Sequence, residues 1–272
     1  MPKKPLVSIY LPTRNRSRLL PNAIGSVLQQ TWDNLELIVV DDASDDSTPE
    51  ILQQYSEKSR IKVIRNQDPA GAAASRNLAV GIASGEFVTG IDDDDLFMPE
   101  RIEMLVRAFT DGISGTCSND RMVYDQRELI WKKRSLISSS DLLFYNQVGN
   151  QLLTRRDYFS GSGGFDESLP SAQDYDLWIR IAQNYGPVKT VPHTLQVVNM
   201  KQDETRITLS EDKITGYRAC FEKHKQKMSP EQIQYQRYRL ALAEGRNPSW
   251  NELISSVPAS LWFKEIKRKL FF

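Results

Sequence analysis

The sequence has little cysteine and no long hydrophobic run. Its 272 residues include two cysteines, Cys117 and Cys220, which lie too far apart for the ligand spacing of a zinc site. This excludes a disulfide scaffold and is typical of a protein kept in a reducing compartment. The first apolar stretch, from Leu6 to Leu11, stops at Pro12, so it is too short for a signal peptide or a membrane span. We therefore expect a cytoplasmic protein.

The chain also lacks an excess of either charge. Lys+Arg and Asp+Glu both number 35, which gives a formal net charge of zero. Proteins that bind nucleic acid carry a strongly basic surface, so we expect no nucleic-acid partner. Two phosphate-binding patterns are missing as well. There is no Gly-x-x-x-x-Gly-Lys-Ser/Thr loop, and no predicted strand runs into Gly-x-Gly-x-x-Gly, which excludes P-loop chemistry and leaves no dinucleotide fingerprint.

The first hundred residues alternate between strand and helix patterns. Short apolar, β-branched runs predict strands, and stretches with apolar residues on one helical face predict helices. The predicted strands are 6–11, 35–40, 61–64 and 86–91, and the predicted helices include 72–84 and one that opens at Pro99. Such alternation predicts an α/β fold with a Rossmann-like, mostly parallel sheet flanked by helices. Ligands of these sheets bind beyond the carboxyl ends of the strands.

Three of these strand ends are polar and should gather on one rim of the sheet. They are the segments 12–15 (Pro-Thr-Arg-Asn), 41–44 (Asp-Asp-Ala-Ser) and 92–95 (four aspartates). The aspartates are the strongest signal, because adjacent carboxylates repel one another and are costly to bury without a positive group. Alternate residues of an extended chain share a face, so Asp92 and Asp94 point the same way. Hard oxygen ligands suit Mn²⁺ or Mg²⁺; the alternative is a solvated acidic loop or a helix cap.

Three further residues each have two interpretations. Asp42 either accepts hydrogen bonds from a nucleotide base or ribose, or forms an Asx turn that caps the next helix. Arg76 follows Gly71 and a run of alanines, which would let a ligand approach closely, but a surface arginine is the commoner explanation. Asp174 begins a predicted helix and is either a helix cap or a base that takes a proton from an attacking hydroxyl.

Seven segments in this order resemble family 2 of the inverting glycosyltransferases, which have the GT-A fold. The resemblance covers roughly residues 5–207. One such segment alone would be weak, but seven in the right order with appropriate gaps are hard to obtain by chance. The matching segments are Val7–Arg16, Ser26–Thr31, Glu36–Ser44, Ser75–Asn77, Gly85–Val88 with the aspartates that follow, Gly163–Leu169 and Gln173–Trp178.

The resemblance implies roles that the residues alone leave open. A UDP-sugar donor would be held by the following residues: Pro12, Thr13, Arg14, Asp42, Arg76, Asp92 and Asp93. Asp94, together with Asp92, would bind the metal, Mn²⁺ or Mg²⁺. Asp174 would be the catalytic base, which deprotonates an acceptor hydroxyl so that it attacks the anomeric carbon from the face opposite the diphosphate.

The sequence departs from the family pattern in two places. Many relatives have Glu-Asp at the base motif, whereas the first residue here is Gln173. Many also place a late histidine on the metal, but the corresponding stretch, Val197–Lys201, has none. His193 comes earlier and is interpreted as the end of a strand or, alternatively, as a ligand. The third protein ligand of the metal therefore stays open.

The last part of the chain is predicted to be helical. We expect a catalytic GT-A domain at 1–207 and a helical region at 208–272. Its final stretch, Leu261–Phe272, mixes basic and aromatic residues, which suits either a helix at the inner face of an anionic membrane or a helix packed on the domain. Membrane contact would favour a glycan acceptor linked to polyprenyl diphosphate, as in bacterial O-antigen or capsule assembly.

Two other functions compete with glycosyl transfer. A sugar nucleotidylyltransferase would also use an α/β sheet, a metal and a nucleotide, but it should open with a glycine-rich basic loop, whereas this chain has Pro12-Thr13-Arg14-Asn15-Arg16. A non-catalytic descendant of a glycosyltransferase, acting as an assembly subunit, would have no need of the intact aspartates.

Overall fold

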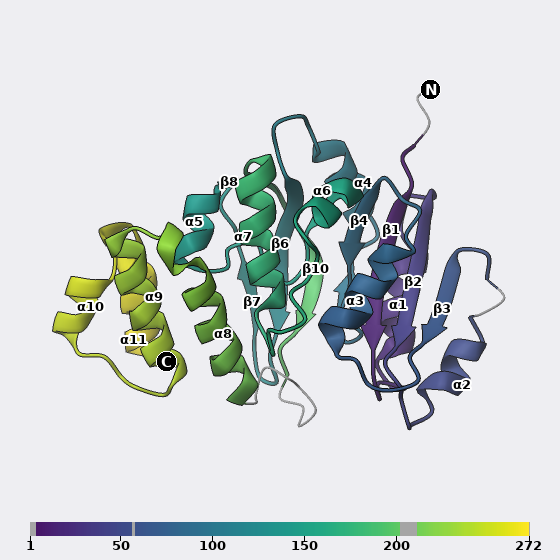
Figure 1. Ribbon diagram of the computed structural model, residues 1–272, viewed down its shortest axis with the longest axis horizontal. Helices are drawn as coiled ribbons and strands as arrows, with labels where there is room; N and C mark the ends of the chain where they lie inside the picture. The colour runs from purple at the N-terminus through teal and green to yellow at the C-terminus, as the bar shows by residue number, and fades with distance from the viewer. Residues whose placement is uncertain (1–3, 56–57, 202–210, 272) are drawn as a thin grey trace.

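The computed structural model describes residues 4–55, 58–201 and 211–271, and in these residues the chain forms one twisted sheet with helices on both faces (Figure 1). The strand order along the sheet is β3-β2-β1-β4-β9-β6-β10-β5, with β7 paired to β6 and β8 to β10. The strands are β1 Val7–Thr13, β2 Leu35–Asp41, β3 Ile61–Arg65, β4 Phe87–Gly90, β5 Leu96–Phe97, β6 Gly115–Val123, β7 Glu128–Trp131, β8 Leu136–Ile137, β9 Leu153–Arg155 and β10 Val188–Asn199.

The sheet is parallel in its first half and mixed in its second. Strands β3, β2, β1 and β4 run parallel, and β6 and β10 are parallel to each other. Between these blocks, the short strand β9 pairs antiparallel with both β4 and β6. The expected α/β fold with a mostly parallel sheet is confirmed.

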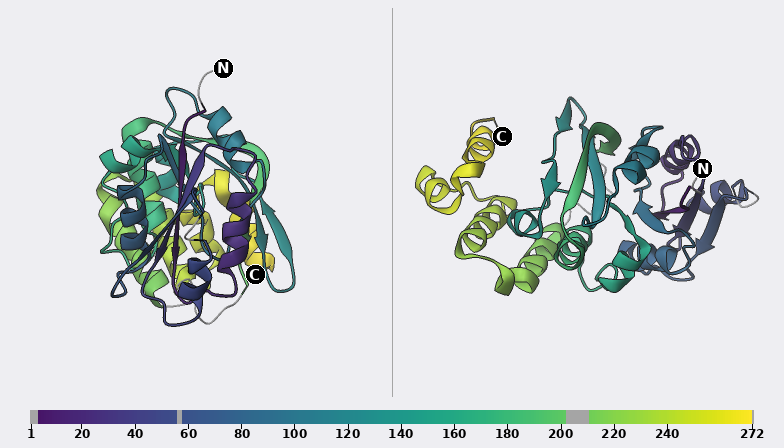
Figure 2. Two further views of the ribbon diagram at one scale, coloured as in Figure 1. Left: turned by 90° about the vertical axis from the view of Figure 1, so that its right-hand side faces the viewer. Right: turned by 90° about the horizontal axis from the view of Figure 1, so that it is seen from above.

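Helices cover the two faces of the sheet, as the two views in Figure 2 show. Alternate residues of one strand point to opposite faces. Ile9 and Leu11 of β1 therefore pack into one core with α1 and α4, whereas Tyr10 packs into the other with α3 and α7. The helices of the sheet region are α1 Leu20–Leu28, α2 Thr48–Gln53, α3 Ala72–Gly81, α4 Arg101–Ala108, α5 Ser139–Phe144, α6 Arg156–Gly161 and α7 Gln173–Tyr185.

Helices are the only regular secondary structure in the described residues after position 210, and they gather at one end of the molecule, far from α2 and β3 (Figure 1). They are α8 Glu211–His224, η2 Lys225–Lys227, α9 Pro230–Ala243, α10 Trp250–Ser256, η3 Ala259–Leu261 and α11 Trp262–Phe271. The buried side chain of Glu265 on α11 accepts a hydrogen bond from Tyr235 on α9, so α11 packs on its neighbours along that face. The expected boundary between residues 207 and 208 lies outside the described residues.

Two local expectations were wrong. Strand β1 continues through Pro12 to Thr13, because β4 pairs with β1 only as far as Tyr10 and the proline has a strand on one side alone. Helix α3 ends at Gly81 rather than Ser84, since the chain must leave the helix to bring Gly85 against Ser8. A Cβ atom on Gly85 would lie 2.7 Å from the backbone nitrogen of Ser8.

Candidate functional site

The carboxyl ends of β1, β2 and β4 meet at one edge of the sheet, because these strands are parallel and in register. Thr13 lies beside Asp41, and Gly90 lies beside Tyr10. A cavity of about 500 Å³ opens at this edge. Every residue that the sequence assigned to donor, metal or proton transfer lines it: Pro12, Thr13, Arg14, Asp42, Arg76, Asp92, Asp93, Asp94 and Asp174.

Asp92 is the centre of a hydrogen-bond network in this cavity. Its Oδ1 accepts hydrogen bonds from Arg76 Nη2 at 2.9 Å and from Gln151 Nε2 at 3.3 Å. Its Oδ2 accepts one from Asn150 Nδ2 at 2.9 Å. Arg76 also reaches Gln173 Oε1 at 3.3 Å, so its guanidinium joins the aspartates to the first turn of α7. Both oxygens of Asp92 are thus held in fixed positions by protein donors.

Asp93 turns toward the end of β1 instead. Its Oδ2 accepts a hydrogen bond from Thr13 Oγ1 at 2.7 Å, and its Oδ1 lies 3.6 Å from Arg16 Nε. Burial raises the pKa of Asp93 to about 7, with the charges of Asp94 and Asp92 adding to the effect. Asp93 therefore fastens the Pro12–Thr13 strand end to the acidic segment.

Asp95 has a structural role that the sequence did not separate from its neighbours. It is 1% exposed, and its carboxylate accepts hydrogen bonds from the side chains of Asn150 and Gln196 and from the backbone N–H of Asn199. Burial, followed by the charges of Asp92 and Asp94, raises its pKa well above the usual value. Asp95 thus ties the acidic segment to β10, beneath the cavity.

Asp42 supports the loop that follows β3. Its Oδ1 accepts hydrogen bonds from Asn66 Nδ2 at 2.7 Å and Ala70 N at 2.8 Å, and its Oδ2 accepts one from Gly71 N at 2.8 Å. Burial works to raise the pKa of Asp42, but these hydrogen bonds outweigh it and lower the pKa overall. Gly71 has φ of 89°, a conformation that favours glycine, and the loop leads directly into α3. Asp42 therefore shapes one wall of the cavity.

Asp174 lies in the first turn of α7, across the cavity from β1. Its Oδ2 accepts a hydrogen bond from Asn146 Nδ2 at 3.2 Å. Burial raises the pKa of Asp174 to about 6; the charge of Asp92 raises it too, while Arg76 lowers it. A carboxylate with a pKa near neutrality is suited to accept a proton during catalysis.

The amides of the 146–151 segment are the main part of the site that the sequence missed. Asn146 contacts Asp174, while Asn150 and Gln151 contact Asp92. The segment is held in place by Trp178, whose Nε1 donates to Gly149 O at 3.0 Å. No local pattern marks these amides, because the partners they orient come from distant parts of the chain.

Non-glycine residues with positive φ line the same cavity or directly adjoin, in the sequence, residues that line it. In the described part of the chain they are Asn15, Ala43 and Ala172, with φ of 56°, 57° and 58°. Asn15 follows β1, Ala43 follows β2, and Ala172 precedes α7. Residues with a side chain adopt this conformation at a cost, and such strain concentrates at functional sites.

The cavity has the donor set that a divalent cation needs. Asp92 and Asp94 both line it, and carboxylate oxygens are preferred ligands of Mg²⁺ and Mn²⁺. Burial is the main cause of the raised pKa values of Asp93 and Asp95, and the charges of neighbouring aspartates add to it; a cation would offset that added charge. Both oxygens of Asp92 accept hydrogen bonds from protein groups, and Asp94 lines the same cavity as the second carboxylate of the pair that the family resemblance assigns to the metal. His193, the alternative ligand, is exposed on β10.

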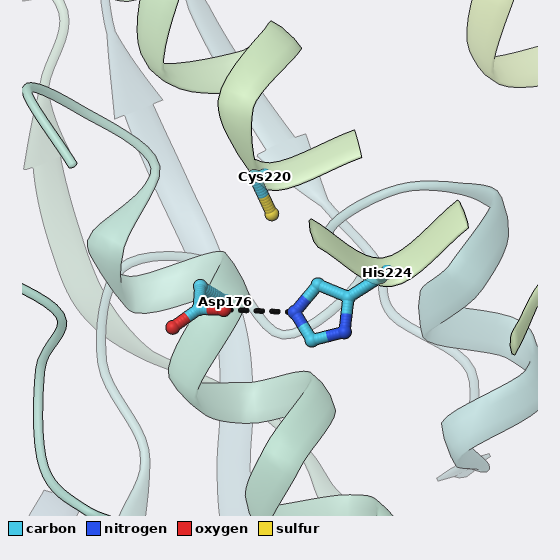
Figure 3. Close-up of side chains that lie close together, drawn as sticks. All are labelled: Asp176, Cys220 and His224. Carbon is cyan, nitrogen blue, oxygen red and sulfur yellow. Dashed lines mark hydrogen bonds and ion pairs between the residues drawn. The ribbon is translucent and has the colours of Figure 1, made fainter. Parts of the chain in front are cut away.

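A second group of potential metal ligands lies elsewhere, between α7 and α8. Asp176, Cys220 and His224 are buried there, with ligand atoms within 4.8 Å of one another (Figure 3). The carboxylate of Asp176 already accepts a hydrogen bond from Arg180 and forms an ion pair with Lys223 at 3.0 Å. Burial raises the pKa of the Cys220 thiol, which keeps it neutral. We therefore interpret this group as an ionic clamp between two helices rather than a metal centre.

This clamp predicts acid-sensitive stability. Burial works to raise the pKa of Asp176, but hydrogen bonds from His224 and Arg180 hold it well below its usual value. A lowered pKa contributes stability above the unfolded-state value, which is lost as the pH falls through the folded-state value. We expect Asp176→Asn to lower the free energy of unfolding by about 1 to 3 kcal/mol, because it replaces a fully buried carboxylate that accepts hydrogen bonds from Arg180 and His224. Urea titrations at several pH values measure this; equal stability of mutant and wild type at pH 7 would contradict it.

Asp33→Asn is the matched control for that experiment. Asp33 pairs with Lys4 at 2.7 Å, but both side chains are exposed. Exposed ion pairs contribute little to stability, so this variant should unfold at nearly the same urea concentration as the wild type.

The chain thus has an α/β fold with an acidic cavity at the carboxyl ends of its parallel strands, and comparison with known proteins establishes its family. Residues 8–168 match the family described as Glycosyl transferase family 2, and the chain belongs to this family. It is 36% identical over 269 residues to WcaA of Escherichia coli (strain K12), whose name assigns it to colanic acid biosynthesis as a glycosyl transferase; the match covers 94% of each chain.

A shorter match links the chain to WfgD of Escherichia coli, named as a UDP-Glc:alpha-D-GlcNAc-diphosphoundecaprenol beta-1,3-glucosyltransferase. The identity is 42% over 101 residues, which cover 37% of this chain and 40% of WfgD.

Solved structures share the fold. S. aureus TarS 1-349 in complex with UDP-GlcNAc superposes with a TM-score of 0.68 at 18% identity, covering 97% of this chain and 80% of that one. The mannosyltransferase PcManGT from Pyrobaculum calidifontis, in complex with GDP-Man and Mn²⁺, gives a TM-score of 0.60 at 18% identity, covering 99% and 82%. The expected GT-A fold is therefore confirmed.

Proposed function

We propose that this family 2 glycosyltransferase moves a sugar from a UDP-sugar to a hydroxyl of a glycan acceptor, with inversion at the anomeric carbon. The observation that carries the proposal is the cavity itself, where Asp174, Arg76 and the three aspartates 92–94 lie together. The aspartates could hold a cation that offsets the charge of a diphosphate donor, the arginine adds positive charge, and a carboxylate of raised pKa can accept the proton of an acceptor hydroxyl.

Asp174 is the proton acceptor in this mechanism. Its carboxylate takes the proton of the acceptor hydroxyl, whose oxygen forms a bond to the anomeric carbon as the bond to the UDP oxygen breaks. Arg76 holds Asp92 and offers positive charge near the departing diphosphate. A divalent cation, held by Asp94 with Asp92, would supply further charge stabilisation for the leaving group.

The donor would lie along the β1 and β2 ends. Pro12 and Thr13 form the buried floor there, and Asp42 supports the opposite wall. Arg14 is exposed at the rim and is available to the phosphates or to the sugar. A UDP donor is supported by the complex of TarS with UDP-GlcNAc and by the name of WfgD, and a lipid-linked glycan acceptor is supported by the name of WfgD. The name of WcaA supports a place in surface polysaccharide synthesis.

This function is testable by a donor screen. UDP-sugars are tested with Mn²⁺ for thermal stabilisation and for release of UDP. We expect stabilisation by UDP-sugars that depends on the metal, followed by transfer to a lipid-linked glycan. Binding without any donor turnover, with or without acceptor, would favour the non-catalytic assembly subunit instead.

We also propose that residues 1–207 form the catalytic domain and that the helical region 208–272 meets the cytoplasmic face of a membrane through α11. In the described residues no helix is both long and apolar enough to cross a bilayer. Phe263 and Leu270 are 83% and 61% exposed and lie seven residues apart, on one face of α11, with exposed Lys267 between them. Exposed apolar groups beside basic ones favour binding to an anionic surface.

Liposome flotation tests this membrane contact. The wild type should float with vesicles that contain anionic lipid at low salt, and Phe263→Ser should reduce the bound fraction about threefold or more, because the apolar anchor is lost. Leu129→Ser, at an exposed position on β7, is the matched control and should float like the wild type. A wild type that stays unbound at low salt would remove the membrane proposal and leave the enzymatic one intact.

A further inference from the structure

Helix α8 lies directly behind the turn that carries the proposed base. The turn, Pro170–Gln173, lines the cavity and leads into Asp174 at the start of α7. Ser171 Oγ lies 3.1 Å from the carbonyl oxygens of both Asp212 and Lys213 on α8, so its one hydroxyl hydrogen is shared between them. The two helices run side by side (Figure 1).

The closest approach is at Gly216, which is buried in the middle of α8. A Cβ atom at this position would lie 2.3 Å from Ser171 Oγ, 2.5 Å from Ser171 O and 2.6 Å from Ser171 N. Two of these three atoms belong to the backbone and are not free to rotate away. A side chain at position 216 therefore has to displace the turn toward the cavity or displace α8 away from the turn.

Two further features show how closely the turn is determined. Ala172, the residue between Ser171 and α7, has φ of 58°, a costly conformation for alanine that the surrounding packing must enforce. One turn further along α7, Asp176 accepts a hydrogen bond from His224 Nε2 of α8 at 2.8 Å. Helix α8 therefore contacts the chain on both sides of Asp174, at Ser171 before it and at Asp176 after it.

We infer that α8 positions the catalytic base, and that Gly216 is a positioning residue for glycosyl transfer because it lets Ser171 seat against the helix. The inference rests on the proposed role of Asp174. It also gives the helical region a part in the active site that is separate from membrane contact.

Gly216→Ala tests this inference. The added methyl displaces the turn, so kcat should fall about tenfold to hundredfold, as expected for a small misplacement of a reacting group. The Kd for UDP, measured with Mn²⁺, should change less than about twofold, because the donor-side residues lie on β1 and α3 and in the segments that follow β1, β2 and β4. The matched control is Gly25→Ala in α1, where an added Cβ meets nothing within 4 Å; its kcat should match the wild type.

Other outcomes separate this inference from the proposed function. Wild-type kcat in Gly216→Ala, with an inactive Asp174→Asn, would overturn the inference alone; an active Asp174→Asn would overturn the base assignment. If Gly216→Ala lowers only the amount of folded protein and leaves kcat per folded molecule unchanged, the inference is also overturned. Should Gly216→Ala fail to fold, Ser171→Ala decides the matter. It removes the shared hydrogen bond to α8, so it should lower kcat about threefold to tenfold, and an unchanged kcat would overturn the inference.

Discussion

Replacing Asp174 with asparagine should lower kcat by about a thousandfold or more while leaving the Kd for UDP nearly unchanged. The amide keeps the shape of the carboxylate and its contact with Asn146, but it cannot accept a proton from the acceptor hydroxyl. General base catalysis contributes about a hundredfold to ten-thousandfold, so removing it should dominate every other effect of the substitution. Steady-state kinetics and calorimetry with UDP and Mn²⁺ separate the two quantities.

The pH dependence gives a second measure of the same role. Since the pKa of Asp174 is raised to about 6, kcat/KM should be high above this pH, where the carboxylate is ionised, and should fall as the pH drops through it. The residual activity of Asp174→Asn should lack this acid limb. Asp157→Asn, at an exposed position in the first turn of α6, is the control and should keep both the rate and the profile. An Asp174→Asn enzyme with wild-type kcat would remove the assignment.

The parallel half of the sheet could be predicted because buried parallel strands have a simple sequence pattern. Strand β2 is a mostly apolar run, broken by Glu36 alone before it ends in Asp41, and β1 and β4 resemble it. The strand ends then follow from topology, which is why seven of the nine assigned residues share one cavity; the other two, Arg76 and Asp174, reach it from helices α3 and α7. Sequence alone could place these residues on one rim, but it could not assign their partners.

The second half of the sheet has no such pattern. Strand β6 buries polar residues, including Asp120, whose carboxylate pairs with Lys133 at 2.7 Å in the interior. A strand with buried charges does not stand out in a sequence, because its compensating partner comes from a separate segment. For the same reason the sequence does not predict the roles of Asn146 and Asn150, because their partners, Asp174 and Asp92, come from distant segments of the chain.

The four consecutive aspartates show most clearly what the fold adds. In the sequence they are equivalent, yet each has a different environment in the structure. Asp92 is held by Arg76 and two amides, Asp93 is bonded to Thr13, and Asp95 is buried against β10. The fold thus separates three of the four by their partners, whereas the metal-binding role of Asp94 follows from the family resemblance and from its place in the cavity lining.

Asp94→Asn should therefore produce the second large effect, a loss of at least about a hundredfold in kcat/KM together with the loss of metal-dependent UDP binding. A bound cation stabilises charge on a leaving diphosphate by several kcal/mol, and an amide is a much weaker ligand than a carboxylate. The direct readout is thermal: Mn²⁺ with UDP should raise the melting temperature of the wild type but not of Asp94→Asn.

Asp111→Asn is the control for this experiment, because Asp111 is exposed in the turn after α4. It should show the full metal-dependent shift in melting temperature. An Asp94→Asn protein that is still stabilised by Mn²⁺ and UDP to the same extent would assign the cation to Asp92 instead. That outcome would require Asp92 to exchange hydrogen bonds from Arg76 and Asn150 for the metal, and it would free Arg76 to face the diphosphate. The two arrangements predict different effects of Arg76→Lys. If Arg76 chiefly orients Asp92, the substitution should weaken Mn²⁺ binding, whereas if it meets the diphosphate, it should lower kcat at saturating metal.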